Sequence, residues 1–172
     1  MKNCVVLIGA PCSGKSTIGR GLARLAGYKY VSSGDIARNI ANSREEIDNL
    51  NAGCMANEDS MRRAVLQLFD SGDDIVLDGF PRFVDQLNWF MDNIVCALNY
   101  NVLFIEITAS AIDIASRASK RGRSDDVSIE RRIRWYEENT VPMIRHIKDL
   151  YHMNILVINN EYRSDYDESS RI

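Results

Sequence analysis

Residues 9–17 combine glycines, a lysine and two hydroxyl side chains at a spacing that suits phosphate binding. Gly9 and Gly14 allow backbone geometry that other residues avoid, so the loop can turn its N–H groups inward around phosphate oxygens. Lys15 adds a positive charge, and the hydroxyl of Ser16 or Thr17 suits a magnesium ion. The segment therefore predicts a site for a nucleoside triphosphate and Mg. The residues expected to contact the nucleotide are Gly9, Pro11, Cys12, Ser13, Gly14, Lys15, Ser16 and Thr17.

A second motif, Asp78-Gly-Phe-Pro-Arg82, directly follows an apolar run. At the end of a strand Asp78 could hold the Mg ion or its waters near the phosphate loop. Pro81 restricts the backbone that aims Arg82, and a guanidinium can grip a phosphate through two parallel hydrogen bonds. Alone these residues could form a plain turn, but beside the phosphate loop they predict a second phosphate site.

The segment 32–38 carries a weaker signal. Ser33 is predicted to cap a helix, and Asp35 would be favourable in its first turn. Arg38 lies one turn further on, from where it could reach back towards the same cleft.

Arginines gather between residues 117 and 134. Arg117 and Arg121 are four residues apart and would share one helix face, where they repel each other unless an anion lies between them. Phosphoryl transfer needs such cationic donors around the migrating group. A solvated network of surface salt bridges is the alternative. The cluster also includes Arg123 and Arg132, with Asp125 and Asp126 as acidic anchors, whereas Arg131 and Arg134 are expected on a solvated face.

Short apolar runs without alternation predict strands that are covered on both faces, and helical stretches separate them. We therefore predict an α/β, three-layer P-loop NTPase fold, in which a five-stranded parallel sheet has helices on both faces. Ligands bind at the carboxyl ends of such strands, where the first three motifs begin. The predicted strands are residues 4–8, 29–31, 75–77, 102–107 and 155–158, and the predicted helices are residues 15–26, 36–50, 59–69, 84–98, 111–120 and 129–150.

Composition narrows the possible partners. The 172 residues include 21 basic and 24 acidic side chains and no basic stripe, which argues against a nucleic-acid partner. No signal peptide and no apolar stretch of membrane-spanning length are seen, so we expect no membrane partner and a cytoplasmic location. We also expect a monomer. The four cysteines form no Cys-x-x-Cys pair, so no zinc site is predicted. Oxidation of Cys12 would block the loop, unless this residue is only a passive small side chain.

Taken together, these motifs and the arginine cluster resemble the adenylate kinase family of nucleoside monophosphate kinases. The similarity runs in the family's order from the phosphate loop to about Pro142, through Asp78-Gly-Phe-Pro-Arg82 and a run of Arg-x-Asp-Asp followed by Arg-x-x-x-Tyr-x-x-x-Thr-x-Pro. The resemblance implies one kinase domain over residues 1–172, with a helical insertion at 33–70 that binds the monophosphate. An ordinary long crossover is the alternative reading of that insertion.

The implied reaction is ATP + AMP = 2 ADP, by direct in-line transfer. By resemblance Lys15 binds the ATP phosphates and Arg117 packs on the ATP adenine. Gln86 would read the acceptor base through its amide, which favours AMP, unless it is an exposed helix residue. The residues implied to bind the acceptor are Ser33, Arg38, Gly79, Arg82 and Gln86. The implied catalytic residues are Lys15, Arg82, Arg121, Arg123, Asp125, Asp126 and Arg132. The residues implied to hold Mg, in part through water, are Ser16, Thr17 and Asp78.

The chain also departs from the family pattern. Cys12 and Ser16 replace glycines, and the lid is reduced to a vestige near residues 121–124. Two other readings remain open: a kinase of small metabolites similar to shikimate kinases, whose loop this chain also resembles, and a nucleotide-binding module without turnover.

Overall fold

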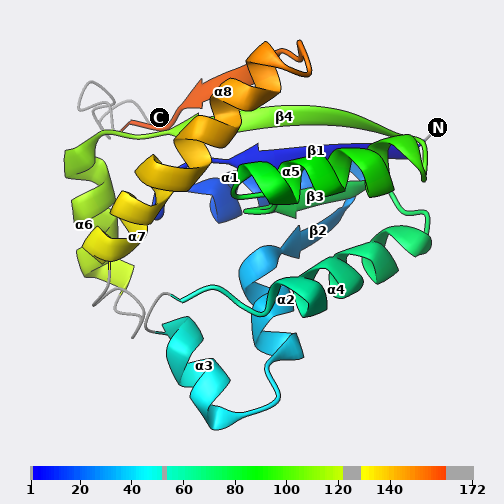
Figure 1. Cartoon of the computed structure of the whole chain (residues 1–172). Coiled ribbons are helices and arrows are strands. Elements are labelled where there is room, and N and C mark those ends of the chain that lie inside the picture. Colours follow the sequence, from blue (N-terminus) through cyan, green and yellow to red (C-terminus); the bar gives the residue numbers. More distant parts are fainter. Residues whose placement is uncertain (1, 52–53, 122–128, 162–172) are drawn as a thin grey trace.

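The computed structural model describes residues 2–51, 54–121 and 129–161, with a parallel sheet at its centre (Figure 1). The strand order is β2-β3-β1-β4-β5, so the predicted five-stranded parallel sheet is confirmed. β3 is buried along its whole length, as expected for an apolar strand covered on both faces. The strands are β1 (Lys2–Ile8), β2 (Lys29–Ser32), β3 (Ile75–Asp78), β4 (Tyr100–Thr108) and β5 (Ile155–Asn159).

The strand register brings the three predicted motifs together. Leu7 of β1 pairs with Asp78 of β3, and Ser32 of β2 pairs with the same aspartate. The chain leaves all three strands at the same edge of the sheet. The phosphate loop, the segment after β2 and the segment after β3 therefore begin side by side, where parallel sheets bind their ligands.

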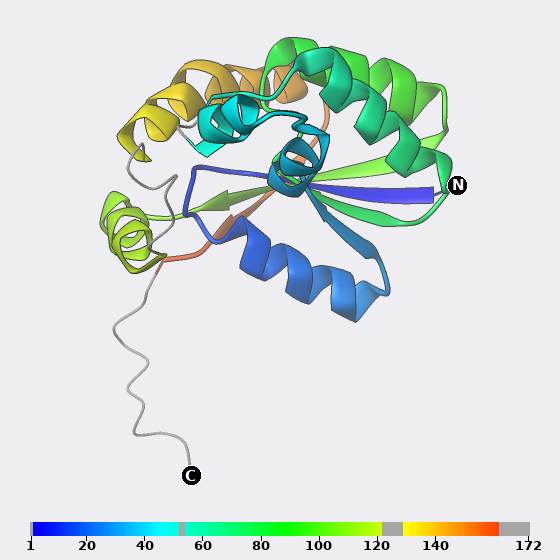
Figure 2. The same cartoon turned by 90° about the horizontal axis from the view of Figure 1, so that it is seen from below.

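Helices cover both faces of the sheet. α1 lies against one face, and α4, α5 and α8 lie against the other (Figure 2). A large apolar core that includes Phe69, Phe90 and Tyr100 fills the second face, whereas a smaller core including Leu7 and Ala23 lies under α1. The helices are α1 (Lys15–Ala26), α2 (Ser33–Ile40), α3 (Arg44–Asn51), α4 (Glu58–Asp70), α5 (Val84–Phe90), α6 (Ala111–Arg121), α7 (Ile129–Trp135) and α8 (Val141–Asp149).

The single helix predicted over 36–50 is wrong, because the structure has two helices, α2 and α3, in its place. Ala41 adopts an extended conformation (φ −67°, ψ 122°) and ends α2. The Ser43 hydroxyl then accepts a hydrogen bond from the Glu46 N–H at 3.1 Å, and the Glu46 carboxylate accepts one from the Asn42 N–H at 2.6 Å. This is a capping arrangement, and Ser43-x-x-Glu46 is its signature in the sequence.

Two predicted helices contain π-helical turns. The stretch predicted at 84–98 consists of α5 followed by the turn η1 (Met91–Cys96), and α7 and α8 are joined by the turn η3 (Tyr136–Thr140). A π turn shifts the direction in which the following side chains point and occurs often near functional sites. The turn η3 lies beside the cleft described below.

Candidate active site

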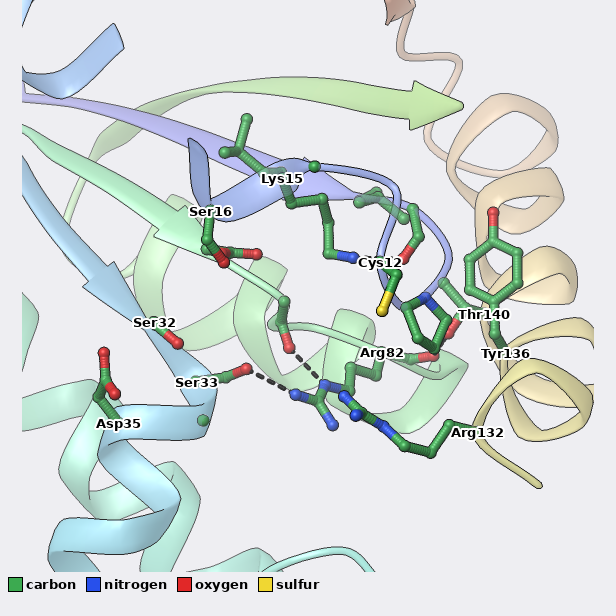
Figure 3. A pocket seen from close by; sticks show the side chains of 18 of the residues that line it. Cys12, Lys15, Ser16, Ser32, Ser33, Asp35, Arg82, Arg132, Tyr136 and Thr140 are labelled. Atoms are coloured by element: carbon green, nitrogen blue, oxygen red, sulfur yellow. Dashed lines mark hydrogen bonds between the residues drawn. The ribbon is translucent and has the colours of Figure 1, made fainter. Parts of the chain in front are cut away.

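A cleft of about 480 Å³ opens at the carboxyl ends of the central strands. Figure 3 shows side chains from the phosphate loop, from the start of α2, from the segment after β3 and from the helices after residue 129 all pointing into it. The structure thus brings most of the predicted site residues into one space. Those that line the cleft are Gly9, Pro11, Cys12, Gly14, Lys15, Ser16, Thr17, Ser33, Arg38, Asp78, Gly79, Arg82, Arg117 and Arg132.

Gly14 begins α1 in a left-handed conformation (φ 98°). This backbone geometry strains any larger residue, and a Cβ atom there would lie 2.2 Å from Nδ2 of Asn160, whose side chain would have to move. The adjacent Lys15 ammonium donates hydrogen bonds to the carbonyls of Gly9 (2.8 Å) and Ala10 (2.7 Å). Burial lowers the pKa of Lys15 to about 8, although nearby Asp78 opposes the shift. An anion beside Lys15 would therefore stabilise its charged form.

Ser13 contributes its backbone rather than its side chain. Its carbonyl accepts hydrogen bonds from the Arg117 guanidinium at 3.2 Å and from the Asn160 amide at 2.8 Å. Arg117 also donates to the carbonyl of Asn160 at 2.6 Å. Arg117 and the residue after β5 therefore hold the back of the phosphate loop. No motif marks Asn160, whose position depends on how β5 pairs with β4.

Two oxygen donors meet at the start of α1. The hydroxyls of Ser16 and Tyr30 donate to the same oxygen of Asp78, at 2.7 and 2.6 Å. Thr17, the alternative to Ser16, also lines the cleft. Hard oxygens suit magnesium, which proteins hold with one or two carboxylates while substrate phosphates complete the shell. Ser16 and Asp78 supply oxygen atoms of this kind and fit a magnesium ion shared with a nucleotide.

Tyr30 was missed by the sequence analysis, although it lies in a predicted strand. Burial, followed by its hydrogen bond to Asp78, raises the pKa of the Tyr30 phenol to about 12. The phenol therefore stays protonated and remains a hydrogen-bond donor to the carboxylate at neutral pH.

Arg82 is aimed into the cleft by its neighbours. Its guanidinium donates to the carbonyl of Gly79 at 2.7 Å and to the Ser33 hydroxyl at 2.9 Å, and Figure 3 shows it beside the guanidinium of Arg132. Thr140, in the turn η3, donates to the Arg82 carbonyl at 2.8 Å. Burial, followed by repulsion from Arg132, lowers the pKa of Arg82 to about 10. Two guanidiniums that lie beside each other favour an anion between them.

Two expectations about the segment after β2 change. Ser33 is the first residue of α2 rather than its cap: the cap is Ser32, and the buried Ser33 hydroxyl accepts a hydrogen bond from Arg82. Arg38 lines the cleft, but its guanidinium pairs with Asp35 at 2.5 Å, one turn earlier in the same helix.

Gln86 lies in a second, smaller cavity next to the cleft, with Ser33, Arg38 and Arg82 among its neighbours. The reading of Gln86 as an exposed helix residue is wrong, because only 1% of its surface is accessible. Its carbonyl accepts from the Arg82 N–H at 2.9 Å, and its amide nitrogen donates to Glu58 at 2.8 Å. The sequence analysis did not single out Glu58, which the fold brings here from α4.

Part of the arginine cluster lies outside the described residues. These are Arg123, Asp125 and Asp126, together with the side chain of Arg121 and the predicted lid near 121–124. Their predicted roles are taken up below as proposals.

Comparisons with known proteins agree with this site. A family model described as an AAA domain matches residues 8–134. Adenylate kinases of Mycolicibacterium smegmatis, a Mycobacterium species and Nocardia farcinica are 30%, 33% and 32% identical to the chain. The alignments cover 84–85% of this chain and 85–86% of these relatives. In the described part of the chain no helix is both long and apolar enough to cross a membrane. Similarity of this degree along most of both chains shows that the chain belongs to the adenylate kinase family of nucleoside monophosphate kinases.

Proposed function

We propose that this protein transfers the terminal phosphoryl group of ATP to AMP. The observation that carries the proposal is the pair of cationic sites facing one cleft, Lys15 in the phosphate loop and Arg82 with Arg132 opposite it. A protein that binds a single nucleotide would need only the cationic site at Lys15. Two phosphate sites that share a cleft are what a direct transfer between nucleotides requires.

Each side of the cleft has its own residues. On the ATP side the loop N–H groups and Lys15 would bind the phosphates, and Arg117 would lie against the adenine. On the acceptor side Arg82 would hold the monophosphate, joined by Arg38 once that side chain leaves Asp35. Ser33, Gly79 and Gln86 would line the rest of the acceptor site, and residues 33–70 would form the insertion that covers it.

The transfer itself would depend on charge. When bound at Ser16 and Asp78, magnesium would neutralise part of the phosphate charge. Arg132 would stabilise the oxygens of the migrating group, because it lines the cleft and its guanidinium lies beside that of Arg82 (Figure 3). By resemblance Arg121 and Arg123 would join it, oriented by Asp125 and Asp126. We further propose that the enzyme acts as a monomer in the cytoplasm.

A coupled assay with ATP tests the proposal against AMP, dAMP, CMP, UMP and shikimate as acceptors. We expect ADP formation with AMP at the highest kcat/KM. Turnover of shikimate alone would favour a small-metabolite kinase, and ATP binding without any turnover would favour a binding module.

Arginine variants test the assigned roles. Arg132→Ala should lower kcat by about 10²–10³-fold, as loss of a transition-state donor does, while the Kd for ATP stays within about threefold. Arg145→Ala is the matched control, because Arg145 is exposed on α8 and does not line the cleft. An equal loss in both variants would contradict the role of Arg132.

A further inference from the structure

We infer that Glu58 determines which bases the acceptor site takes, by fixing the orientation of the Gln86 amide so that it reads an amino group and rejects an oxo group. This inference rests on the proposed function, because it concerns the base of the phosphoryl acceptor. It assigns a specificity role to a residue on α4 that belongs to none of the motifs above.

The two partners of Gln86 force a single orientation of its amide. The Arg82 backbone N–H can only donate, so the atom 2.9 Å from it must be the amide oxygen. The Glu58 carboxylate can only accept, so the atom 2.8 Å from it must be the amide nitrogen. Turning the amide over would place its NH2 group against an N–H and its carbonyl against a carboxylate. Both contacts would then be repulsive, and the side chain is too deeply buried for water to compensate.

Glu58 is itself held in place. Its second carboxylate oxygen accepts a hydrogen bond from Nε of Arg62 at 2.8 Å, one turn further along α4. The Arg62 guanidinium lies over the ring of Trp89, 5.8 Å from the ring centroid. Since Trp89 belongs to α5, as does Gln86, this chain of contacts returns to the helix that carries the amide. The carboxylate is therefore a fixed partner and not a mobile surface group.

The orientation of the Gln86 amide decides between bases, because its two contacts leave one hydrogen-bonding group free at each end of the amide. After its two contacts, Gln86 retains one N–H and one oxygen lone pair for a ligand. A base with an amino group next to a ring nitrogen needs the carbonyl at the amino group and the N–H at the nitrogen. A base with an oxo group next to a ring N–H needs the same two groups in swapped places. A freely turning amide would accept both, whereas a fixed amide accepts one of them.

The test compares pairs of acceptors that differ only in this respect. AMP and IMP form the purine pair, and CMP and UMP form the pyrimidine pair. The measured quantity is the amino-to-oxo ratio of kcat/KM within each pair, for the wild type, Glu58→Ala and Glu58→Gln. A general loosening of the site would lower both members of a pair together, so the ratio separates orientation from stability.

We expect Glu58→Ala to lower both ratios by about tenfold, which corresponds to about 1.4 kcal/mol. Glu58→Gln should lower them further, because Arg62 would hold the new carbonyl and turn the new NH2 group towards Gln86. That arrangement favours the reversed amide. Asp59→Asn is the matched control: it removes the same charge from the next, exposed position of α4 and should leave both ratios unchanged.

Unchanged ratios in both Glu58 variants would overturn the inference, as would an equal change in Asp59→Asn. If a variant is inactive, the same ratios are measured as dissociation constants of the four monophosphates by calorimetry. The proposed function fails separately, if the wild type binds AMP but does not phosphorylate it. The binding ratios would still test Glu58 in that case.

Discussion

Individual side chains in this cleft act through their partners as much as through their own chemistry. A magnesium-binding role is predicted for Asp78 because it ends an apolar strand and begins a motif. Its hydrogen bond from Tyr30 was not predictable, because the two residues come from different strands and meet only when β2 pairs with β3. The same holds for Glu58 and Gln86, which are separated by 28 residues in the sequence.

The Tyr30 hydroxyl should be measurable as a contribution to stability. Tyr30→Phe removes one donor from a carboxylate that is only 5% exposed, and a hydrogen bond to a charged group contributes about 1.5–3 kcal/mol. We expect a loss of about that size in the free energy of unfolding, measured by urea titration without nucleotide. Tyr28→Phe is the control, because Tyr28 lies near the start of the same strand and does not contact Asp78. Equal stability of the two variants would contradict the role given to Tyr30.

At the scale of the elements, α1 shows how packing overrides local preference. Gly19 and Gly21 both lie inside this helix, where glycine is unfavourable by about 1 kcal/mol relative to alanine. A Cβ atom on Gly19 would lie 2.6 Å from Leu7 and 2.8 Å from the ring of Tyr30, whereas a Cβ atom on Gly21 would meet nothing within 4 Å. Gly19 therefore lets α1 approach the sheet closely, and Gly21 has no such role.

The two glycines give opposite predictions. Gly21→Ala should raise the free energy of unfolding by about 0.5–1 kcal/mol through helix propensity alone. Gly19→Ala should lower it by about 1–3 kcal/mol, because overpacking against a buried leucine outweighs that gain. Thermal unfolding of both variants checks the difference. A stabilised Gly19→Ala protein would show that the contact between α1 and the sheet is looser than described.

The helix boundaries within residues 33–70 were harder to predict than the helical character of this segment. Residues 33–70 were expected to be helical, and the described part of this segment forms α2, α3 and α4. The break at Ala41–Ser43 was missed because no glycine or proline marks it. A capping hydroxyl and a glutamate start the new helix there, and that signal is short enough to be hidden in a longer amphipathic pattern.

The shifted pKa values of buried groups predict how the stability of the whole molecule changes at alkaline pH. Burial raises the pKa of Cys4, Tyr30 and Tyr136, so above about pH 9 the unfolded chain releases protons that the folded chain keeps. Stability must then fall as pH rises. Lys15 and Arg82 have the opposite sign, because burial lowers their folded-state pKa, to about 8 for Lys15 and to about 10 for Arg82, so the unfolded chain keeps these protons to a higher pH.

We therefore expect the free energy of unfolding to be flat or slightly rising from about pH 8 to 9 and to fall above about pH 10. Urea titrations at half-unit steps measure this profile. Cys4→Val should lessen the fall by removing one of the buried acids. A stability that keeps rising through pH 10.5 would mean that the basic groups dominate.

The vestigial lid that the sequence predicts near residues 121–124 leads to a prediction about water. α6 ends at Arg121 and α7 begins at Ile129, so most of this segment lies outside the described residues. Because a lid excludes water from the transfer, we expect measurable ATP hydrolysis without AMP and faster release of ADP. Inorganic phosphate is measured with and without AMP, with Arg132→Ala as the control for contaminating ATPases. A complete absence of hydrolysis without AMP would count against this prediction.

The sequence by itself determined the parallel sheet and the phosphate loop, and it predicted a second phosphate site. Each rests on motifs of contiguous residues with a short-range physical cause: apolar strands, glycines in a loop, and charges at strand ends. Only the tertiary structure decided that Ser16 rather than Thr17 faces Asp78, that Arg82 is held by Ser33, and that Glu58 orients Gln86. These contacts join residues from different elements. Their geometry depends on strand register and helix packing, which no local pattern specifies.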